Sequence, residues 1–197
     1  MATVEAILRS VRSASPASGM STSVVALDGY GGAGKSTLAE YLGEILRAEG
    51  RPVDLLHTDD FASADNPLNW WPRLIDQVLQ PLRDGATARY QRYDWDLGHL
   101  AEWHMVQPGG LVLLEGVSAS RNAFRPYLSL SVWIETPAGE RLRRGLERDG
   151  EQARAQWDQW MADEVAWGSA ERPWDRADIV ITGVQGEGLS APEARAP

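Results

Sequence analysis

The sequence contains no cysteine, which excludes disulfides, thiolate metal sites and cysteine nucleophiles. No apolar run approaches the roughly 20 residues that a bilayer-spanning helix needs. The first 20 residues also lack the continuous apolar core of a signal peptide. These absences are typical of a reducing compartment, so we expect a cytoplasmic protein with no membrane partner.

Positive charge is also scarce. The 197-residue chain has a formal net charge of −9 and a pI of about 4.8, whereas a nucleic-acid binder normally carries a basic surface. We therefore expect no nucleic-acid partner, although a few local charges could still hold a small anion. The length and the 43% hydrophobic content fit a single globular domain over residues 1–197.

Lysine occurs once, against 18 arginines, and this Lys35 lies in the stretch "DGYGGAGKSTLA". The stretch matches the P-loop pattern, Gly29-x-x-x-x-Gly34-Lys35-Ser36, after an apolar run and before a helical one. Its glycines let backbone N–H groups surround a phosphate, and a compact ammonium fits where a planar guanidinium does not. The alternative is a chance glycine-rich turn. The predicted nucleotide contacts are Gly29, Gly31, Gly32, Ala33, Gly34, Lys35, Ser36 and Thr37.

Strand-like and helix-like segments alternate along the chain. Strands are predicted at 24–27, 53–56, 111–116, 128–135 and 178–182. Helices are predicted at 2–12, 35–48, 73–83, 138–149 and 151–168. This order predicts an α/β, three-layer P-loop NTPase fold with a mostly parallel five-stranded sheet and helices on both faces. We expect a core over about 24–183, an Arg/Trp-rich lid over about 137–172 and a disordered tail over 184–197.

Acidic residues follow two of the predicted strands. Glu115 ends "LVLLE", and Asp59 and Asp60 follow "VDLL" in "TDDF". Carboxyl ends of parallel strands meet at one sheet edge, beside the P-loop. Ser36, Glu115 and Asp59 are therefore the predicted Mg²⁺ ligands, and either aspartate could be a general base. The alternatives are an acid that caps a strand and a solvated turn.

The predicted lid carries a cluster of arginines in "ERLRRGLERD". We expect Arg144 or Arg148 to reach a transferring phosphate, and Arg143 to pair with Glu147 in solvent. A solvated helix face with no chemical role is the alternative. Three tryptophans of the next helix have helical spacing and are interpreted as packing residues: Trp157, Trp160 and Trp167.

The ordered motifs "DGYGGAGKSTLA", "TDDF", "RYDW", "LLEG" and "RRGLERD" resemble the uridine kinase-like branch of the P-loop nucleoside kinases, over about residues 24–183. The resemblance implies transfer of the γ-phosphoryl group of ATP, with Mg²⁺, to a hydroxyl of a small molecule, most readily a uridine- or cytidine-like nucleoside. It also implies Asp59 as the catalytic base, Asp65 at a ribose diol, Tyr93 and Trp95 at the base, and Arg148 in the lid.

The sequence departs from the family pattern in the acceptor region. The family's base-contacting histidine corresponds to Gly98, and Ala62 replaces a tyrosine. His99 lies one position after Gly98 and is the fourth predicted substrate residue, with Asp65, Tyr93 and Trp95. The acceptor is therefore open between a nucleoside and another alcohol, such as a vitamin precursor or an antibiotic. A non-catalytic nucleotide-binding module is a further alternative, but a GTPase switch needs a second lysine. ATP or GTP preference and homo-oligomer formation also stay open.

Overall fold

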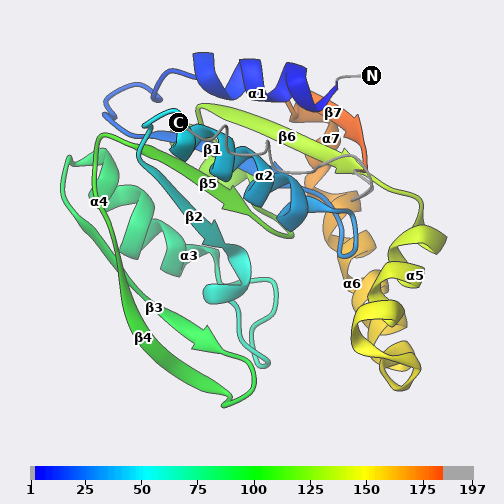
Figure 1. The fold of residues 1–197 in the computed structure, drawn as a ribbon. Helices are drawn as coiled ribbons and strands as arrows, with labels where there is room; N and C mark the ends of the chain where they lie inside the picture. Colours follow the sequence, from blue (N-terminus) through cyan, green and yellow to red (C-terminus); the bar gives the residue numbers. More distant parts are fainter. Residues whose placement is uncertain (1–2, 184–197) are drawn as a thin grey trace, which may run out of the picture.

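The computed structural model describes residues 3–183, so the predicted tail at 184–197 lies outside the described residues. A five-stranded sheet forms its centre in the order β2-β5-β1-β6-β7 (Figure 1). The strands are β1 (Ser23–Asp28), β2 (Val53–His57), β5 (Leu111–Glu115), β6 (Leu130–Glu135) and β7 (Ile179–Thr182). Every neighbouring pair is parallel, which confirms the predicted sheet.

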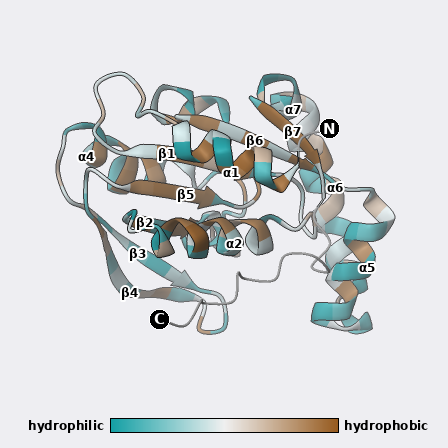
Figure 2. Ribbon diagram, turned by 45° about the horizontal axis from the view of Figure 1, so that its top comes forward, coloured by the Kyte–Doolittle hydropathy of each residue, from teal (hydrophilic) through white to brown (hydrophobic). Residues whose placement is uncertain are grey.

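Side chains alternate between the two faces of the sheet. In β1, Val25 and Leu27 pack against α1 (Val4–Ser13) and α2 (Lys35–Ala48). Figure 2 shows apolar residues concentrated in β5 and along α2. The inner strands β1 and β5 are buried throughout because helices cover both faces of the parallel sheet, whereas the edge strands β2 and β7 are only partly buried.

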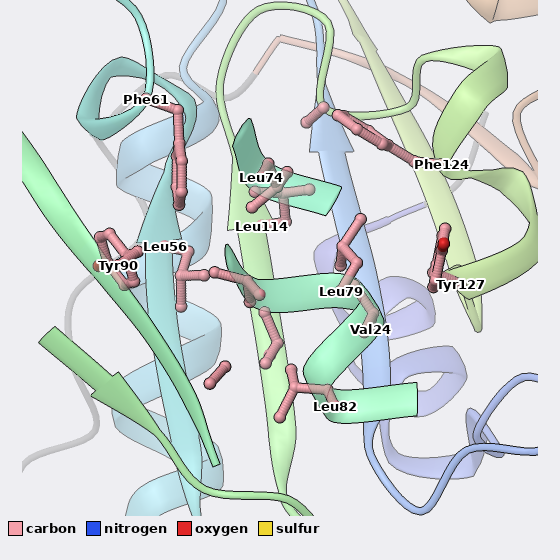
Figure 3. Packing of buried hydrophobic residues seen from close by; sticks show 14 of the residues in the cluster. Val24, Leu56, Phe61, Leu74, Leu79, Leu82, Tyr90, Leu114, Phe124 and Tyr127 are labelled. Atoms are coloured by element: carbon pink, nitrogen blue, oxygen red, sulfur yellow. The ribbon is translucent and has the colours of Figure 1, made fainter. Parts of the chain in front are cut away.

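The other face of the sheet carries a second core (Figure 3). Val24 of β1 and Leu114 of β5 pack there against one continuous helical segment, which the sequence predicted at 73–83. The segment consists of α3 (Trp71–Leu74), a π-helical turn η2 (Ile75–Leu79) and α4 (Gln80–Arg83). The 3₁₀ helices η1 (Thr58–Asp60) and η3 (Asn122–Tyr127) border this core. The sheet with its two helical layers confirms the three-layer fold.

An antiparallel hairpin of β3 (Ala88–Asp94) and β4 (His99–Val106) was not predicted. Only its inner side is buried, through Tyr90 and Val106, whereas Trp103 and Met105 of the outer side are exposed. Because only one side is buried, polar and apolar residues alternate along the segment, and the continuous apolar run that identified the other strands is missing.

The predicted lid comprises α5 (Ala138–Asp149), η4 (Glu151–Ala153) and α6 (Arg154–Glu171), followed by α7 (Pro173–Arg176). Figure 1 shows α5 and α6 beside the sheet, opposite the β3–β4 hairpin. Trp157 and Trp167 are buried, which agrees with their predicted packing role. Within residues 3–183, no helix combines the length and the apolar character needed to cross a membrane.

Candidate active site

The P-loop connects β1 to α2 at the carboxyl edge of the sheet. Gly34 has φ +97° immediately before the helix, a left-handed conformation that glycine adopts without steric cost. The first N–H groups of α2 therefore face the loop, where no preceding helical turn can accept their hydrogen bonds. A helix N-terminus of this kind stabilises a bound anion.

The hydrogen bonds of the loop divide its N–H groups into two sets. Three already donate within the protein: Gly29 to Asp28 Oδ1 at 2.7 Å, Gly31 to Glu164 Oε1 at 2.7 Å and Ala33 to Tyr30 O at 3.1 Å. Within residues 3–183 no acceptor faces the N–H groups of Gly32, Gly34, Lys35 and Ser36. Of the eight predicted nucleotide contacts, Gly29, Gly31 and Ala33 therefore have N–H groups that already donate within the protein.

Lys35 lies inside the loop and not on its surface. The residue is only 7% exposed, and its Nζ donates to the carbonyl of Tyr30 at 3.0 Å. This bond folds the side chain back over the loop, where the ammonium lies close to the free N–H groups. One positive charge and several free N–H donors in one place form a cradle for phosphate oxygens.

Asp28 anchors the start of the P-loop, a role that was not predicted from the sequence. Its buried carboxylate accepts hydrogen bonds from Gly29 N (2.7 Å), Ser118 N (2.9 Å), Ser120 N (2.8 Å) and Ser120 Oγ (2.6 Å). Burial raises the pKa of Asp28, whereas these hydrogen bonds lower it. The carboxylate ties the P-loop to the loop that follows β5. An acid directly before the first glycine was the signal available in the sequence.

Ser36 and Glu115, two of the three predicted Mg²⁺ ligands, contact one another. Ser36 Oγ donates to Glu115 Oε1 at 3.2 Å, and Glu115 is buried at the end of β5. His57 Nδ1 lies 2.5 Å from the same oxygen, a contact that raises the pKa of His57. No cluster of three or more acidic or histidine residues suited to a metal exists within residues 3–183. Such a sparse oxygen set fits Mg²⁺, which takes few protein ligands and completes its shell with phosphate oxygens and water.

Asp59 and Asp60 have different surroundings. Asp60 Oδ2 accepts a hydrogen bond from the Tyr90 hydroxyl at 3.1 Å, whereas no donor among the described residues bonds the Asp59 carboxylate. Trp95 Nε1 holds the Asp59 backbone carbonyl at 3.1 Å. Although Asp59 is open to solvent on one side, the protein atoms around its carboxylate raise its pKa, as does Glu115, while Lys35 and His57 lower it. Asp59 is the aspartate with a free carboxylate.

A hollow of about 450 Å³ lies near Asp59, and Phe61, two residues further along the chain, is the first of its lining residues. It is lined by Phe61, Ser63, Asn66, Asn69, Trp70, Pro72, Arg73, Tyr93 and Leu100. Of the four predicted substrate residues, Tyr93 is in this lining. Trp95 lies just outside it, with its ring 5.3 Å from that of Tyr93.

The other two predicted substrate residues do not line the hollow. Asp65 is exposed in the turn between Ser63 and Asn66. His99 is exposed and its ring Nδ1 contacts the Leu100 carbonyl at 3.0 Å. Successive residues of a strand point to opposite sides, so Leu100 faces the hollow and His99 faces away.

The lid arginines have separate environments. Arg144 bonds Glu140 at 2.8 Å and reaches the P-loop carbonyl of Gly32 at 3.3 Å. Arg148 is highly exposed, and its hydrogen bond to Asp149 raises its pKa, with a smaller contribution in the same direction from Asp59. Arg143 pairs with Glu147 in solvent, as expected. Arg141, which was not among the predicted site residues, also reaches the P-loop, at the carbonyl of Gly31 (3.4 Å).

The P-loop, the free carboxylate and the lid on a parallel sheet define the class of fold, that of the P-loop NTPases. No family model matches the sequence, and no curated protein matches it.

Solved structures of several kinases share the fold, including these three. A proposed uridine kinase from Bacillus stearothermophilus has a TM-score of 0.69 at 20% identity, covering 90% of this chain and 96% of the other. A proposed fructose transport system kinase from Silicibacter has a TM-score of 0.66 at 19% identity, covering 92% and 100%. D-glycerate 3-kinase from Cryptococcus neoformans has a TM-score of 0.57 at 17% identity, covering 82% and 85%. These similarities confirm the resemblance to uridine kinase-like P-loop proteins at the level of the fold.

Proposed function

We propose that this protein is an ATP-dependent small-molecule kinase that transfers the γ-phosphoryl group to a hydroxyl of a neutral acceptor, a uridine- or cytidine-like nucleoside. The observation that carries the proposal is the pairing of a phosphate cradle with a free carboxylate. Unpaired loop N–H groups and Lys35 provide the cradle, and Asp59 has no hydrogen-bond donor within residues 3–183. A nucleotide-binding module without catalysis has no need of such a free carboxylate near enough to Lys35 for the ammonium to lower its pKa.

The lining of the hollow favours a neutral acceptor with a ring. Phe61, Trp70 and Tyr93 offer aromatic surface, and Ser63, Asn66 and Asn69 offer neutral hydrogen-bonding groups. These groups suit a planar base with attached hydroxyls.

A hydroxy acid is disfavoured by the charge of the hollow. Arg73 is the one cation among its lining residues, and its guanidinium already donates to the carbonyls of Asp60, Phe61 and Gln91. An acceptor carboxylate would therefore find no free positive partner there, which makes burial of its charge costly.

Each residue of the site has a defined task in the proposed reaction. The free N–H groups and Lys35 bind the phosphates, and Asp59 takes the proton of the acceptor hydroxyl. Arg144 and Arg148 neutralise charge that develops on the transferring group. Ser36 and Glu115, with Asp59 near them, would hold Mg²⁺, which supplies charge neutralisation and phosphate orientation when bound.

A substrate screen that measures ADP release tests the proposal. Uridine and cytidine are compared with fructose, D-glycerate and neutral aromatic alcohols at equal concentrations, with and without Mg²⁺. We expect release only with Mg²⁺, and faster release with the nucleosides than with fructose or glycerate. If only an aromatic non-nucleoside alcohol is turned over, the protein is still a kinase, but its acceptor is not a nucleoside. Acceptor-independent hydrolysis, or no release with any compound, would contradict the kinase itself.

A further inference from the structure

The lid helix α6 places a carboxylate directly against the P-loop. Glu164 is fully buried at 0% exposure, and its Oε1 accepts the Gly31 N–H at 2.7 Å. Its Oε2 lies 3.2 Å from Arg141 Nη1 of helix α5. The Trp160 side chain lies beside the same carboxylate, against Gly31, and lowers its pKa. One side chain therefore joins the phosphate loop to both helices of the lid.

The packing around this contact is tight. A Cβ atom added to Gly31 would lie 3.0 Å from Glu164 Oε1 and 3.2 Å from Trp160 Nε1. A Cβ added to Gly32 would lie 2.6 Å from the Arg141 carbonyl. The loop is thus held between α5 and α6, and a side chain at position 31 would require the Glu164 and Trp160 side chains to shift.

The charge of Glu164 is balanced locally. Arg141 is also buried; besides Glu164, it donates to the carbonyls of Thr136 at 3.2 Å and Gly31 at 3.4 Å. Burial raises the pKa of Glu164, and the Gly31 N–H, Lys35 and Arg141 lower it. An unpaired buried carboxylate would repel a bound phosphate, whereas this ion pair brings no net negative charge to the cradle.

Glu164 does not take the place of a phosphate. A group that mimics phosphate would accept from Lys35 and from consecutive N–H groups of the helix start. Lys35 Nζ bonds Tyr30 instead, and the N–H groups of Gly34, Lys35 and Ser36 have no acceptor within the described residues. The carboxylate takes one N–H outside that set and leaves the cradle open.

We propose that Glu164 is a positioning residue that holds the P-loop in its phosphate-binding shape from the lid. It acts through the Gly31 N–H and through Arg141, and it does not contact the reacting atoms. The inference rests on the proposed use of ATP. Because Arg144 of α5 also contacts the loop carbonyl of Gly32, the same connection sets the place of the lid arginines.

The test is the affinity for ATP with Mg²⁺, measured by calorimetry without any acceptor. Glu164→Ala removes the acceptor of the Gly31 N–H and leaves Arg141 unpaired, so we expect the dissociation constant to rise at least about tenfold. Glu164→Gln keeps an oxygen for Gly31 and nearly the same shape, so we expect a smaller loss. Asp163→Ala is the matched control, because Asp163 lies on the same helix and bonds only the exposed Gln159 at 3.0 Å. We expect this control to bind ATP normally.

Thermal melting establishes which variants are folded at the temperature of the binding measurement. If Glu164→Ala fails to fold, the folded Glu164→Gln protein carries the test, with an expected loss of about two- to fivefold against the control. Unchanged affinity in the folded variant would reduce Glu164 to a packing residue. Tighter binding would show that the carboxylate competes with phosphate, which also overturns the inference. No ATP binding by the unaltered protein would instead refute the proposed function, on which the inference depends.

Discussion

Replacing the two neighbouring aspartates in turn separates the general base from a structural neighbour. The Asp59 carboxylate has no hydrogen-bond donor within residues 3–183, so Asp59→Asn leaves no protein partner without its acceptor. Its amide cannot take a proton at neutral pH. We expect kcat to fall about 100-fold or more, the usual size of a general-base contribution. That fall corresponds to about 2.7 kcal/mol or more of activation free energy.

Asp60→Asn should behave differently, because Asp60 accepts the Tyr90 hydroxyl and an amide oxygen can still do so. Exchanging a charged acceptor for a neutral one costs about 1 kcal/mol of stability. We expect kcat to change by less than about fivefold, as the Asp60 carboxylate is already occupied. The free energy of unfolding should fall slightly for Asp60→Asn and stay unchanged for Asp59→Asn.

The assay is steady-state ADP release at saturating ATP and acceptor, together with the dissociation constant for ATP and the apparent affinity for Mg²⁺. We expect ATP affinity to change little in both variants. A large loss of Mg²⁺ affinity in Asp59→Asn, recovered at high Mg²⁺, would identify Asp59 as a metal ligand and not as a base. A larger loss of kcat in Asp60→Asn than in Asp59→Asn would refute the assignment.

Three further predictions concern the loop and the lid. Lys35→Ala should abolish phosphoryl transfer, and Lys35→Arg should fail as well, because the planar guanidinium is too large for the buried site of this side chain; full activity of the arginine variant would contradict this. Arg144→Ala should lower kcat by about 10- to 1,000-fold at saturating ATP. Arg143→Ala should change kcat little, because Arg143 forms only exposed ion pairs. Equal kcat values for the two variants would mean that these arginines belong to a solvated helix face with no chemical role. Gly145→Ala should lower the free energy of unfolding by about 1–3 kcal/mol in denaturant titrations, because its Cβ would overlap the indole ring of Trp157. Gly139→Ala on the same helix meets nothing within 4 Å and should show no such loss.

Local sequence was enough to predict the parts of the site that depend on contiguous residues. The P-loop is a short pattern between an apolar strand and an amphipathic helix, so its place in the chain and the turns that its glycines permit follow from contiguous residues. Parallel strands bring their carboxyl ends to one edge, and for this reason the sequence alone predicts that Ser36, Glu115 and Asp59 lie together. The five strands were predicted on similar grounds, since each contains a short apolar run; this run is fully buried in β1 and β5 and partly buried in the edge strands β2 and β7.

The tertiary structure decided what depends on strand faces and on distant partners. His99 faces away from the acceptor hollow because a shift of one residue in a strand reverses the side on which a side chain lies. Glu164 contacts Gly31 across 133 positions, and Asp28 contacts Ser120 across 92. The local sequence does not identify such distant partners. A buried glutamate on α6 has the same kind of neighbours along the chain as a glutamate exposed to solvent. Only the packing of α5 and α6 on the P-loop distinguishes them, since it removes the carboxylate from water and supplies the donors that make its burial stable.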